Sequence, residues 1–413
     1  MAGIAVDHAR GSAITDVDGN TLIDIIGGIG VNGLGHSHPK WIKAVQDQVA
    51  LSSVGSFTSP ARVQLLERLS ENAPGPGMNR LQMYSGGSEA VESALRLAKS
   101  YTKRTEFVSF WGAFHGKTLG SLSLMGSEFK QDLGPMPPGN LSVPYANCYR
   151  CPLQKKPSDC GMACVELAKK QIKMNSSGKI AAVVVEPMQG TAGNVIPPDE
   201  FLPAVQDLAK NLGALLIVDE MITGFGRTGK FWGSQHSGIQ PDIVTLGKQF
   251  GGGFPVSAVL SRDEIVMSKP WGNPSGSSSS YGGNPLAAVA VHASLKIIED
   301  ESLVENSRVV GAHFLKKLEA LQDKYSFIDH AHGRGLFLGL EMVKNKKTKE
   351  PISKIAAHKI FDACLKRGLL TMAYSPSFRI QPAMTIDVAT VDHVVEVLDE
   401  VFGVAEYGNW KDD

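Results

Sequence analysis

Two charged residues at the ends of apolar runs could do chemistry together. Asp219 ends the run "ALLIVD", and Lys248 ends "PDIVTLGK", 29 residues later (248 − 219). Ligands bind at the carboxyl ends of strands in α/β sheets. Burial lowers the pKa of a lysine amine and frees its lone pair for Schiff-base chemistry. Asp219 taken alone is equally explained as a helix cap or a turn residue, whereas a surface position explains Lys248 poorly.

A lysine imine beside a fixed carboxylate is what pyridoxal phosphate requires. The carboxylate keeps the pyridine nitrogen protonated, so that the ring can accept electrons. The pair therefore predicts a pyridoxal 5'-phosphate site, with Lys248 as the covalent attachment and proton carrier and Asp219 as the partner of the ring nitrogen.

The elements that must position these residues read as an α/β protein. Short apolar runs alternate with helical patterns, which indicates βα units around a mostly parallel sheet. The expected strands are 80–84, 106–110, 180–186, 214–219, 243–246 and 256–260. After about residue 300 the pattern is that of a smaller α+β domain: helices at 302–325, 353–367 and from Val391, and one strand at 333–343. We expect an N-terminal segment (1–41) that joins the small domain, a large cofactor-binding domain (42–300) and a C-terminal small domain (301–413).

Composition excludes several classes of protein. The 413 residues are 43% hydrophobic and 20% charged, with 41 basic and 41 acidic residues. This balance gives little electrostatic support for binding nucleic acid or an anionic membrane. No apolar run approaches the roughly 18 residues of a membrane span, and the N-terminus lacks the regions of a signal peptide. We expect a cytoplasmic enzyme acting on small molecules.

Four cysteines are close together in "CYRCPLQKKPSDCGMAC": Cys148, Cys151, Cys160 and Cys164. The C-x2-C pair matches the spacing of a structural zinc site, but the second pair is C-x3-C. The alternatives are a disulfide staple in a loop and reduced thiols in a surface insertion. No catalytic role nearby requires them, so the predicted active site contains no metal.

Several motifs together resemble the class III, omega-type aminotransferases. They are Asp219-Glu220, "TGFGRTG" (223–229), "PDIVTLGK" (241–248), "GGGFP" (251–255) and "YGGNPLA" (281–287), in the order and spacing of that family. The resemblance extends from about Gly11 to Val404. It implies fold type I of the pyridoxal-phosphate enzymes and a homodimer with active sites at the subunit interface, and it leaves open whether dimers pair into tetramers.

The resemblance assigns the other cofactor contacts one at a time. Gly87 and Ser88 open a helix, where free N–H groups and the helix dipole favour a phosphate; as a plain N-cap, Ser88 would look the same. Phe114 would stack on one face of the cofactor and Met221 on the other, although Phe114 alone reads as a core residue. Ser280 replaces the usual threonine and would donate its hydroxyl to the phosphate held by the partner subunit.

Five positions bear on the substrate. Arg379 matches the arginine that binds the α-carboxylate as a bidentate fork, the alternative being a surface arginine. Ile29 lies where dialkylglycine decarboxylases have glutamine, which favours transamination, although it could equally be a core residue. Thr191 and Ile222 replace a glutamate and a glutamine of the 4-aminobutyrate and ornithine enzymes. Lys117 stands where the 4-aminobutyrate enzymes have an arginine that binds the distal carboxylate of the substrate. A lysine could still pair with that carboxylate as a point charge.

The predicted function is transfer of an amino group from an amine or ω-amino acid to a keto acid, pyruvate or 2-oxoglutarate. Glu186 and Gln189 would support the site by hydrogen bonding, and loops 27–33, 55–60 and 274–281 would shape the donor pocket. A 4-aminobutyrate-type aminotransferase, a racemase, a decarboxylase and a phospho-lyase remain alternatives on the same fold. A dinucleotide-binding protein is a further alternative, but "GFGRTG" lacks the helix that must follow its glycines.

Overall fold

The computed structural model describes residues 3–55, 58–126, 128–374 and 376–412. Within them a seven-stranded sheet has the order β4-β10-β9-β8-β7-β5-β6. Its strands are β4 (Met78–Tyr84), β5 (Glu106–Phe110), β6 (Asn140–Val143), β7 (Ile180–Val185), β8 (Leu215–Asp219), β9 (Ile243–Leu246) and β10 (Ser257–Arg262). The pairs from β9 to β6 are parallel, and β10 is antiparallel to both of its neighbours. The predicted mostly parallel α/β sheet is confirmed, with β6 as an edge strand that the sequence did not suggest.

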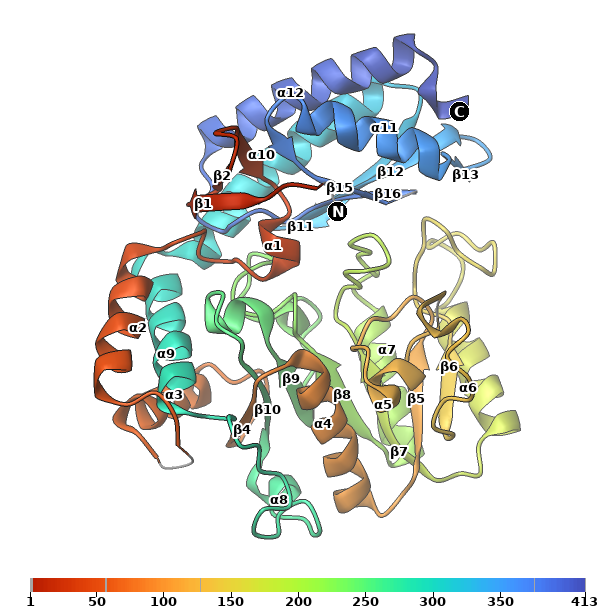
Figure 1. Cartoon of the computed structure of the whole chain (residues 1–413). Coiled ribbons are helices and arrows are strands. Elements are labelled where there is room, and N and C mark those ends of the chain that lie inside the picture. Colours follow the sequence, from red (N-terminus) through yellow and green to blue (C-terminus); the bar gives the residue numbers. More distant parts are fainter. Residues whose placement is uncertain (1–2, 56–57, 127, 375, 413) are drawn as a thin grey trace.

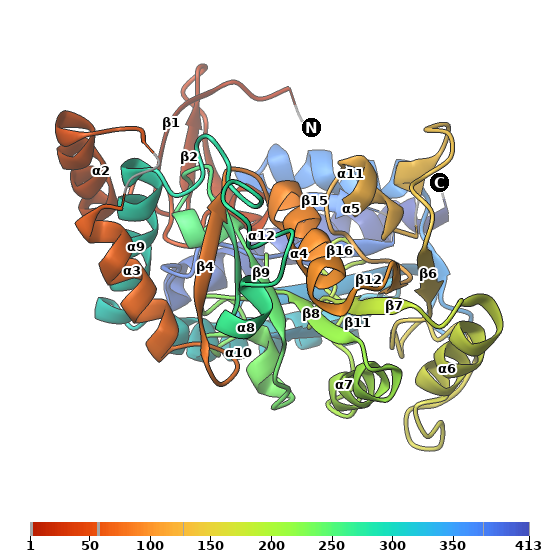
Figure 2. The same ribbon diagram turned by 90° about the horizontal axis from the view of Figure 1, so that it is seen from below.

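Helices cover both faces of this sheet (Figure 2): α4 (Gly87–Thr102) lies on one face, and α7 (Phe201–Leu212) with α6 (Ala163–Asn175) on the other. Alternation along β8 explains the arrangement, because successive side chains of a strand point to opposite faces. Leu216 and Val218 pack in the cluster that contains the apolar residues of α7, whereas Leu215 and Ile217 pack with those of α4. Both faces are therefore buried, as a parallel sheet requires.

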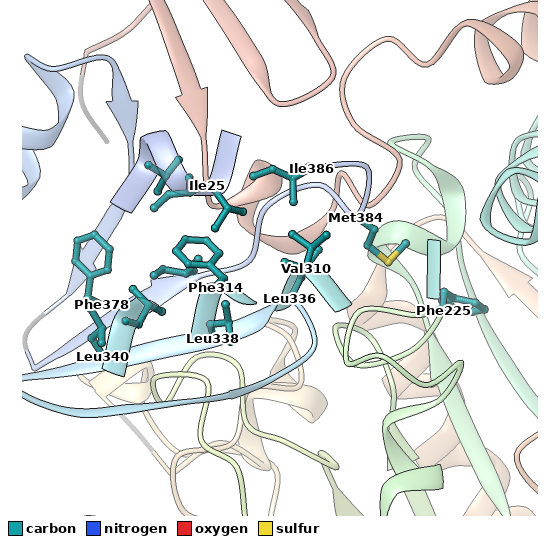
Figure 3. Close-up of a cluster of buried hydrophobic side chains, with 14 of the residues drawn as sticks. Ile25, Phe225, Val310, Phe314, Leu336, Leu338, Leu340, Phe378, Met384 and Ile386 are labelled. Atoms are coloured by element: carbon teal, nitrogen blue, oxygen red, sulfur yellow. The ribbon is translucent and has the colours of Figure 1, made fainter. Parts of the chain in front are cut away.

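A second, antiparallel sheet has the order β11-β12-β16-β15: β11 (Ile328–Arg334), β12 (Phe337–Asn345), β16 (Ser377–Ile380) and β15 (Met372–Tyr374), with β13 (Glu350–Pro351) beside β12. Three helices, α10 (Leu303–Lys324), α11 (Lys354–Leu365) and α12 (Val388–Tyr407), form the upper layer of Figure 1 with it. Figure 3 shows part of the buried cluster to which this layer contributes, with Phe314, Leu338 and Phe378 among its members. The single strand expected at 333–343 is two strands, because Gly335, with φ +56°, makes the tight turn between them.

The N-terminal strands β1 (Val6–Arg10), β2 (Ala13–Asp16) and β3 (Thr21–Asp24) form a third sheet, which β14 (Leu369–Leu370) extends by parallel pairing with β3. The short segment α1 (Gly27–Gly30) then lies between the upper and lower layers in Figure 1. Helices α2 (Pro39–Leu51), α3 (Pro60–Glu71) and α9 (Pro285–Asp300) pack together beside the large sheet. The pairing of β14 with β3 supports an N-terminal segment that joins the small domain, while the domain boundaries stay a prediction.

Candidate active site

Three neighbouring parallel strands place charged side chains at one edge of the large sheet. β7 leads into Glu186, β8 ends at Asp219, and β9 leads through Gly247 into Lys248. Since these strands are adjacent and run in the same direction, their carboxyl ends meet. The structure thus brings together Lys248 and Asp219, which the sequence paired from their positions after apolar runs.

Lys248 has an unusual backbone. Its φ is +51°, in the left-handed region that side chains with a Cβ seldom adopt, and such a residue costs about 1–3 kcal/mol. The preceding Gly247 leaves room for Met221, because a Cβ at Gly247 would lie 2.5 Å from the Met221 sulfur. Strain of this kind persists only where surrounding contacts hold it, and it often marks a functional site.

The electrostatics around Lys248 favour a neutral amine. Burial lowers the pKa of Lys248, and the carboxylates of Asp219 and Glu186 oppose this shift without reversing it. The guanidinium of Arg379, in the small domain, acts in the same direction as burial and lowers the pKa further. A neutral amine has the free lone pair that nucleophilic attack on an aldehyde needs.

Asp219 is held by a residue that the sequence analysis missed, His115. The Asp219 side chain is buried, its Oδ2 lies 2.7 Å from His115 Nδ1, and its Oδ1 accepts a hydrogen bond of 3.1 Å from the Met221 N–H. Burial opposes protonation of His115, but the hydrogen bond to Asp219 and the negative charges of Asp219 and Glu186 outweigh it and raise the pKa of His115. The only signal in the sequence was its position directly after Phe114.

Glu186 ties two loops to the site. Its Oε1 accepts a hydrogen bond of 2.9 Å from the Phe114 N–H, and its Oε2 accepts one of 3.2 Å from the Gly190 N–H. Burial raises the pKa of Glu186 to about 7, with His115 opposing and Asp219 adding to the shift. Gln189 donates to the Trp111 carbonyl at 2.9 Å. These bonds are consistent with the supporting role expected for Glu186 and Gln189.

The start of helix α4 presents two unused N–H groups. Glu89 accepts hydrogen bonds from the N–H groups of Ser85 and Gly86, at 3.0 and 2.7 Å, which leaves those of Gly87 and Ser88 without a partner among the described residues. The Ser88 hydroxyl accepts a hydrogen bond of 3.2 Å from the Lys117 N–H. Free N–H groups at the positive end of a 16-residue helix favour an anion.

Phe114 and Lys117 form part of one aromatic and basic group. The Phe114 ring meets Phe129 edge to face, with centroids 5.6 Å apart. The exposed Lys117 ammonium lies 5.9 Å from the Phe114 centroid and 5.3 Å from that of Phe129, within the range of cation–π attraction. Met221 lies beside the start of α4, where a Cβ at Gly87 would lie 3.3 Å from its sulfur.

Arg379 is a buried residue of strand β16, so the surface-arginine alternative is wrong. It lies opposite Gly339 of β12 and Met372 of β15. One terminal nitrogen donates a hydrogen bond of 3.2 Å to the Gly190 carbonyl, and the other lies 2.7 Å from the Met372 sulfur. Its effect on the pKa of Lys248 places Arg379 within electrostatic reach of that amine.

Ile29 lies in a turn with left-handed backbone. Gly27, Gly28, Ile29 and Gly30 have φ of 51°, 58°, 64° and 73°. Asp24 holds the turn by accepting hydrogen bonds from the N–H groups of residues 26, 27 and 28. Ile29 is 37% exposed, so it is not a core residue in this chain.

Thr191 and Ile222, which differ from the residues of the 4-aminobutyrate enzymes, lie in different surroundings. Ile222 is buried, and its side chain reaches both Gly30 and Gly190, where added Cβ atoms would meet Ile222 carbons at 2.9 and 3.2 Å. Thr191, directly after Gly190, is exposed. The apolar wall beside Gly30 and Gly190 is therefore supplied by Ile222.

Ser280 is exposed, and its hydroxyl makes no hydrogen bond among the described residues. Its loop is fixed at two points, where the Tyr84 hydroxyl donates to the Ser277 carbonyl at 2.8 Å and Arg96 donates to the Gly276 carbonyl at 3.1 Å. An exposed hydroxyl on an anchored loop is compatible with the contact predicted to a partner subunit. In the predicted pocket loop 55–60, residues 56 and 57 lie outside the described part of the chain.

The four clustered cysteines are free thiols that line one small cavity of about 20 Å³. Burial and the other three thiols raise the pKa of Cys148 to about 11. In the described part of the chain, no group of three or more His, Cys, Asp or Glu residues is arranged to hold a metal ion. Between Cys148 and Cys151, Arg150 pairs with Glu341 of β12 at 2.8 Å, so this insertion contacts the small domain.

The site fits pyridoxal phosphate by its chemistry: an amine of lowered pKa, a buried carboxylate and two unused N–H groups at a helix start. Residues 1–402 match the family described as "Aminotransferase class-III". The chain belongs to the class III aminotransferase family. It is accordingly a pyridoxal-phosphate-dependent transaminase of fold type I, acting on an amine donor and a keto-acid acceptor.

The dinucleotide-binding alternative depended on the G-x-G-x-x-G segment (224–229). No α-helix follows these glycines, and the next element is the 3-10 helix η2 (Gly233–His236).

Individual relatives of this aminotransferase differ in their activities. It is 32% identical to a leucine/methionine racemase from Thermococcus litoralis (100% of this chain, 93% of the relative) and 34% identical to a diaminobutyrate–2-oxoglutarate aminotransferase from Rhizobium meliloti (97% and 88%). A solved amine transaminase from an uncultivated Pseudomonas species, in its pyridoxal-phosphate-bound form, superimposes with a TM-score of 0.92 at 29% identity (97% and 95%). Among the described residues, no helix is long and apolar enough to cross a membrane.

Proposed function

We propose that this aminotransferase moves an amino group from an amine or ω-amino acid to a keto acid, pyruvate or 2-oxoglutarate, with Lys248 as the attachment point of the cofactor. The observation that carries the proposal is the Lys248 amine. A strained backbone fixes its position, its pKa is lowered by burial, and Asp219 and Arg379 both lie within electrostatic reach. An aspartate for the cofactor and an arginine for the substrate thus flank one reactive amine.

The cofactor, when bound, supplies an electron sink that stabilises negative charge on the donor carbon. Asp219 would hold the proton on the cofactor ring nitrogen, and His115 keeps the Asp219 carboxylate in place through the 2.7 Å contact. The N–H groups of Gly87 and Ser88 would bind the phosphate, and Phe114 and Met221 would pack against the ring. Each role rests on the family resemblance together with the contacts described above.

Lys248 also moves the proton. Once released from the cofactor, its Nζ removes a proton from the amine-bearing carbon of the donor and then acts as an acid. Because burial lowers the pKa of this amine, the neutral form that can accept a proton is more accessible than in an exposed lysine. Arg379 holds the carboxylate of the keto acid, so that its carbonyl carbon faces this proton carrier.

Lys117 bears on the choice of donor. Its ammonium is exposed and rests on two aromatic rings, a position from which it can pair with the distal carboxylate of an ω-amino acid. Ile222 offers no polar group to a substrate, which suits an amine with an apolar substituent. These features support an amine or ω-amino-acid donor over a strict 4-aminobutyrate specificity.

The functional unit is a homodimer in this proposal. Ser280 is exposed on an anchored loop and would reach the phosphate bound by the partner subunit, so that each active site would need two chains. The mass of the native enzyme in solution distinguishes a dimer from a tetramer. The cytoplasmic location stays a prediction from the sequence.

The visible spectrum of purified holoenzyme tests the proposal. The enzyme is titrated in turn with alanine, β-alanine, 4-aminobutyrate and 1-phenylethylamine, with no keto acid present. Transamination bleaches the band of the lysine-bound cofactor, and addition of pyruvate or 2-oxoglutarate restores it. A coloured enzyme that no donor bleaches contradicts the proposal.

Racemisation of an amino acid at the same centre is a second candidate activity, favoured by the similarity to the Thermococcus racemase. It needs proton removal at the α-carbon and return of a proton to the opposite face, without loss of the amino group. Exchange of the α-proton of L-leucine with deuterium in the solvent, with the visible band unchanged, distinguishes it from transamination.

A further inference from the structure

Gln381 is a buried amide that no role described so far uses. It follows strand β16, two residues after Arg379, and its side chain is fully buried. Its backbone N–H donates a hydrogen bond of 2.8 Å to the Ile25 carbonyl. Neither Nε2 nor Oε1 of its side chain has a hydrogen-bond partner among the described residues. Unpaired buried amides destabilise a fold, so the position calls for a partner outside the chain.

The amide lies close to Ile222 and to the turn that carries Ile29, two of the residues predicted to bear on the substrate. A Cβ at Gly30 would lie 3.5 Å from Gln381 Nε2 and 2.9 Å from the Ile222 side chain. Ile222 also reaches Gly190, whose carbonyl accepts the hydrogen bond from Arg379. Ile222 therefore lies close to two glycines, Gly30 and Gly190. Gly30 is near the Gln381 amide, and Gly190 is hydrogen-bonded to Arg379.

A carboxylate bound by Arg379 would need a second hydrogen-bond donor. One of its terminal nitrogens is engaged with the Gly190 carbonyl and the other with the Met372 sulfur. A carboxylate has two oxygens with about four lone-pair sites, more than this guanidinium satisfies while it keeps both contacts. Gln381 lies two residues after Arg379, just beyond the end of β16, and both residues are connected to Ile222 through the contacts at Gly30 and Gly190.

We propose that Gln381 donates an Nε2 hydrogen bond to the substrate carboxylate that Arg379 binds. It then acts as a specificity residue for 2-oxo acids and amino acids over amines that lack a carboxylate. This inference rests on the proposed function, since it assumes that Arg379 binds the carboxylate.

Three variants of the holoenzyme test the inference. Gln381→Leu keeps the size and removes the donor, Gln381→Glu adds a negative charge that repels a carboxylate, and Gln322→Leu is the control. Gln322, also in the small domain, accepts a hydrogen bond of 2.7 Å from the Ala331 N–H, away from the site. The readouts are kcat/KM for pyruvate and for 1-phenylethylamine, and the Kd of propionate from its effect on the visible cofactor band.

We expect Gln381→Leu to lower kcat/KM for pyruvate about tenfold, through KM, and to raise the Kd of propionate by a similar factor. The loss for 1-phenylethylamine should be several times smaller. Gln381→Glu should have the larger effect on both carboxylates. The control should change the ratio of the two substrates less than twofold.

Equal losses for pyruvate and 1-phenylethylamine, with a lower Tm and an unchanged Kd for propionate, would show that the amide is structural and would overturn the inference. Arg379→Leu separates this from a failure of the proposed function. If Arg379→Leu leaves the Kd of propionate unchanged, the carboxylate binds elsewhere and the proposed function itself is wrong.

Discussion

The two sides of the active site are built differently. On the large-domain side, the Asp219 and Glu186 carboxylates each accept hydrogen bonds from backbone or histidine groups, and regular strands fix their positions. On the other side, a left-handed turn carries Ile29, and the buried Gln381 amide has no partner among the described residues. Carboxylates held by hydrogen bonds suit a cofactor that every member of the family binds, and a buried amide without a partner suits a substrate that differs between members. Backbone strain does not separate the two sides, because Lys248 has a φ of +51° on the large-domain side.

Lys248 should give the largest effect, because it belongs to the half built for the cofactor. Lys248→Ala removes both the attachment point and the proton carrier, so we expect kcat to fall by about 10⁴-fold or more. Stopped-flow absorbance with alanine measures the loss, and Tm should stay within a few degrees, because the substitution keeps the turn. Lys248→Ala with the turnover of the wild type would refute the assignment.

Asp219→Asn comes next and tests whether charge or shape matters at that position. The amide keeps the size but cannot stabilise a protonated ring nitrogen, so kcat should fall about 10²- to 10³-fold. The pKa of His115 should also fall, because the Asp219 carboxylate is what raises it. An NMR titration of the His115 ring follows this shift.

The adjacent Glu220 supplies the matched control. It is fully buried and accepts hydrogen bonds from the Gly233 and Ser234 N–H groups at 3.0 and 2.8 Å. These bonds hold the fold and contact none of the proposed site residues. Glu220→Gln should lower the free energy of unfolding by about 1–3 kcal/mol and change kcat only a few-fold. If both variants lose activity equally, the acid pair acts as one structural unit and the comparison between the two halves fails.

Glu186 gives a prediction about pH. Its pKa is about 7 in the folded protein, against an ordinary value of 4.5. Between these values the folded protein holds a proton that the unfolded chain has lost, so the free energy of unfolding falls as pH rises through this window. His115, with its raised pKa, contributes with the same sign, because its stabilisation is lost as pH rises through the folded value.

Glu186→Gln should therefore flatten the pH dependence of stability in the cofactor-free protein. The wild type should lose up to about 3 kcal/mol more than the variant between pH 5 and 8, measured by urea denaturation. Parallel curves for the two proteins would mean that Glu186 is already ionised at pH 5.

The sequence predicted the large-domain half better than the other half, for a physical reason. Lys248 and Asp219 end apolar runs that form strands, and adjacent parallel strands bring their ends together whatever the loops do. His115 could not be found this way, since its partner Asp219 is 104 residues away. Gln381 was missed because only tertiary packing shows that an amide after an apolar strand is buried without a partner.

Ile29 shows the same limit within one residue. Its position in the substrate loop was predicted, but no propensity predicts a β-branched residue with φ +64°. Three backbone N–H groups that donate to the Asp24 carboxylate hold this conformation against the local preference of the side chain. The preference of the side chain and a set of local hydrogen bonds conflict here, which is typical of functional sites.

The smallest expected effect tests whether this strain is real. Ile29→Gly should raise the free energy of unfolding by about 0.5–1 kcal/mol, because glycine adopts this φ freely and Ile29 is 37% exposed. The control is Ile26→Gly, which removes a buried side chain and should cost about 2–5 kcal/mol. If Ile29→Gly destabilises the protein as much as Ile26→Gly does, the side chain is buried in the assembled enzyme. Ile29 would then belong to the subunit interface, and its left-handed turn would serve the dimer contact rather than the substrate.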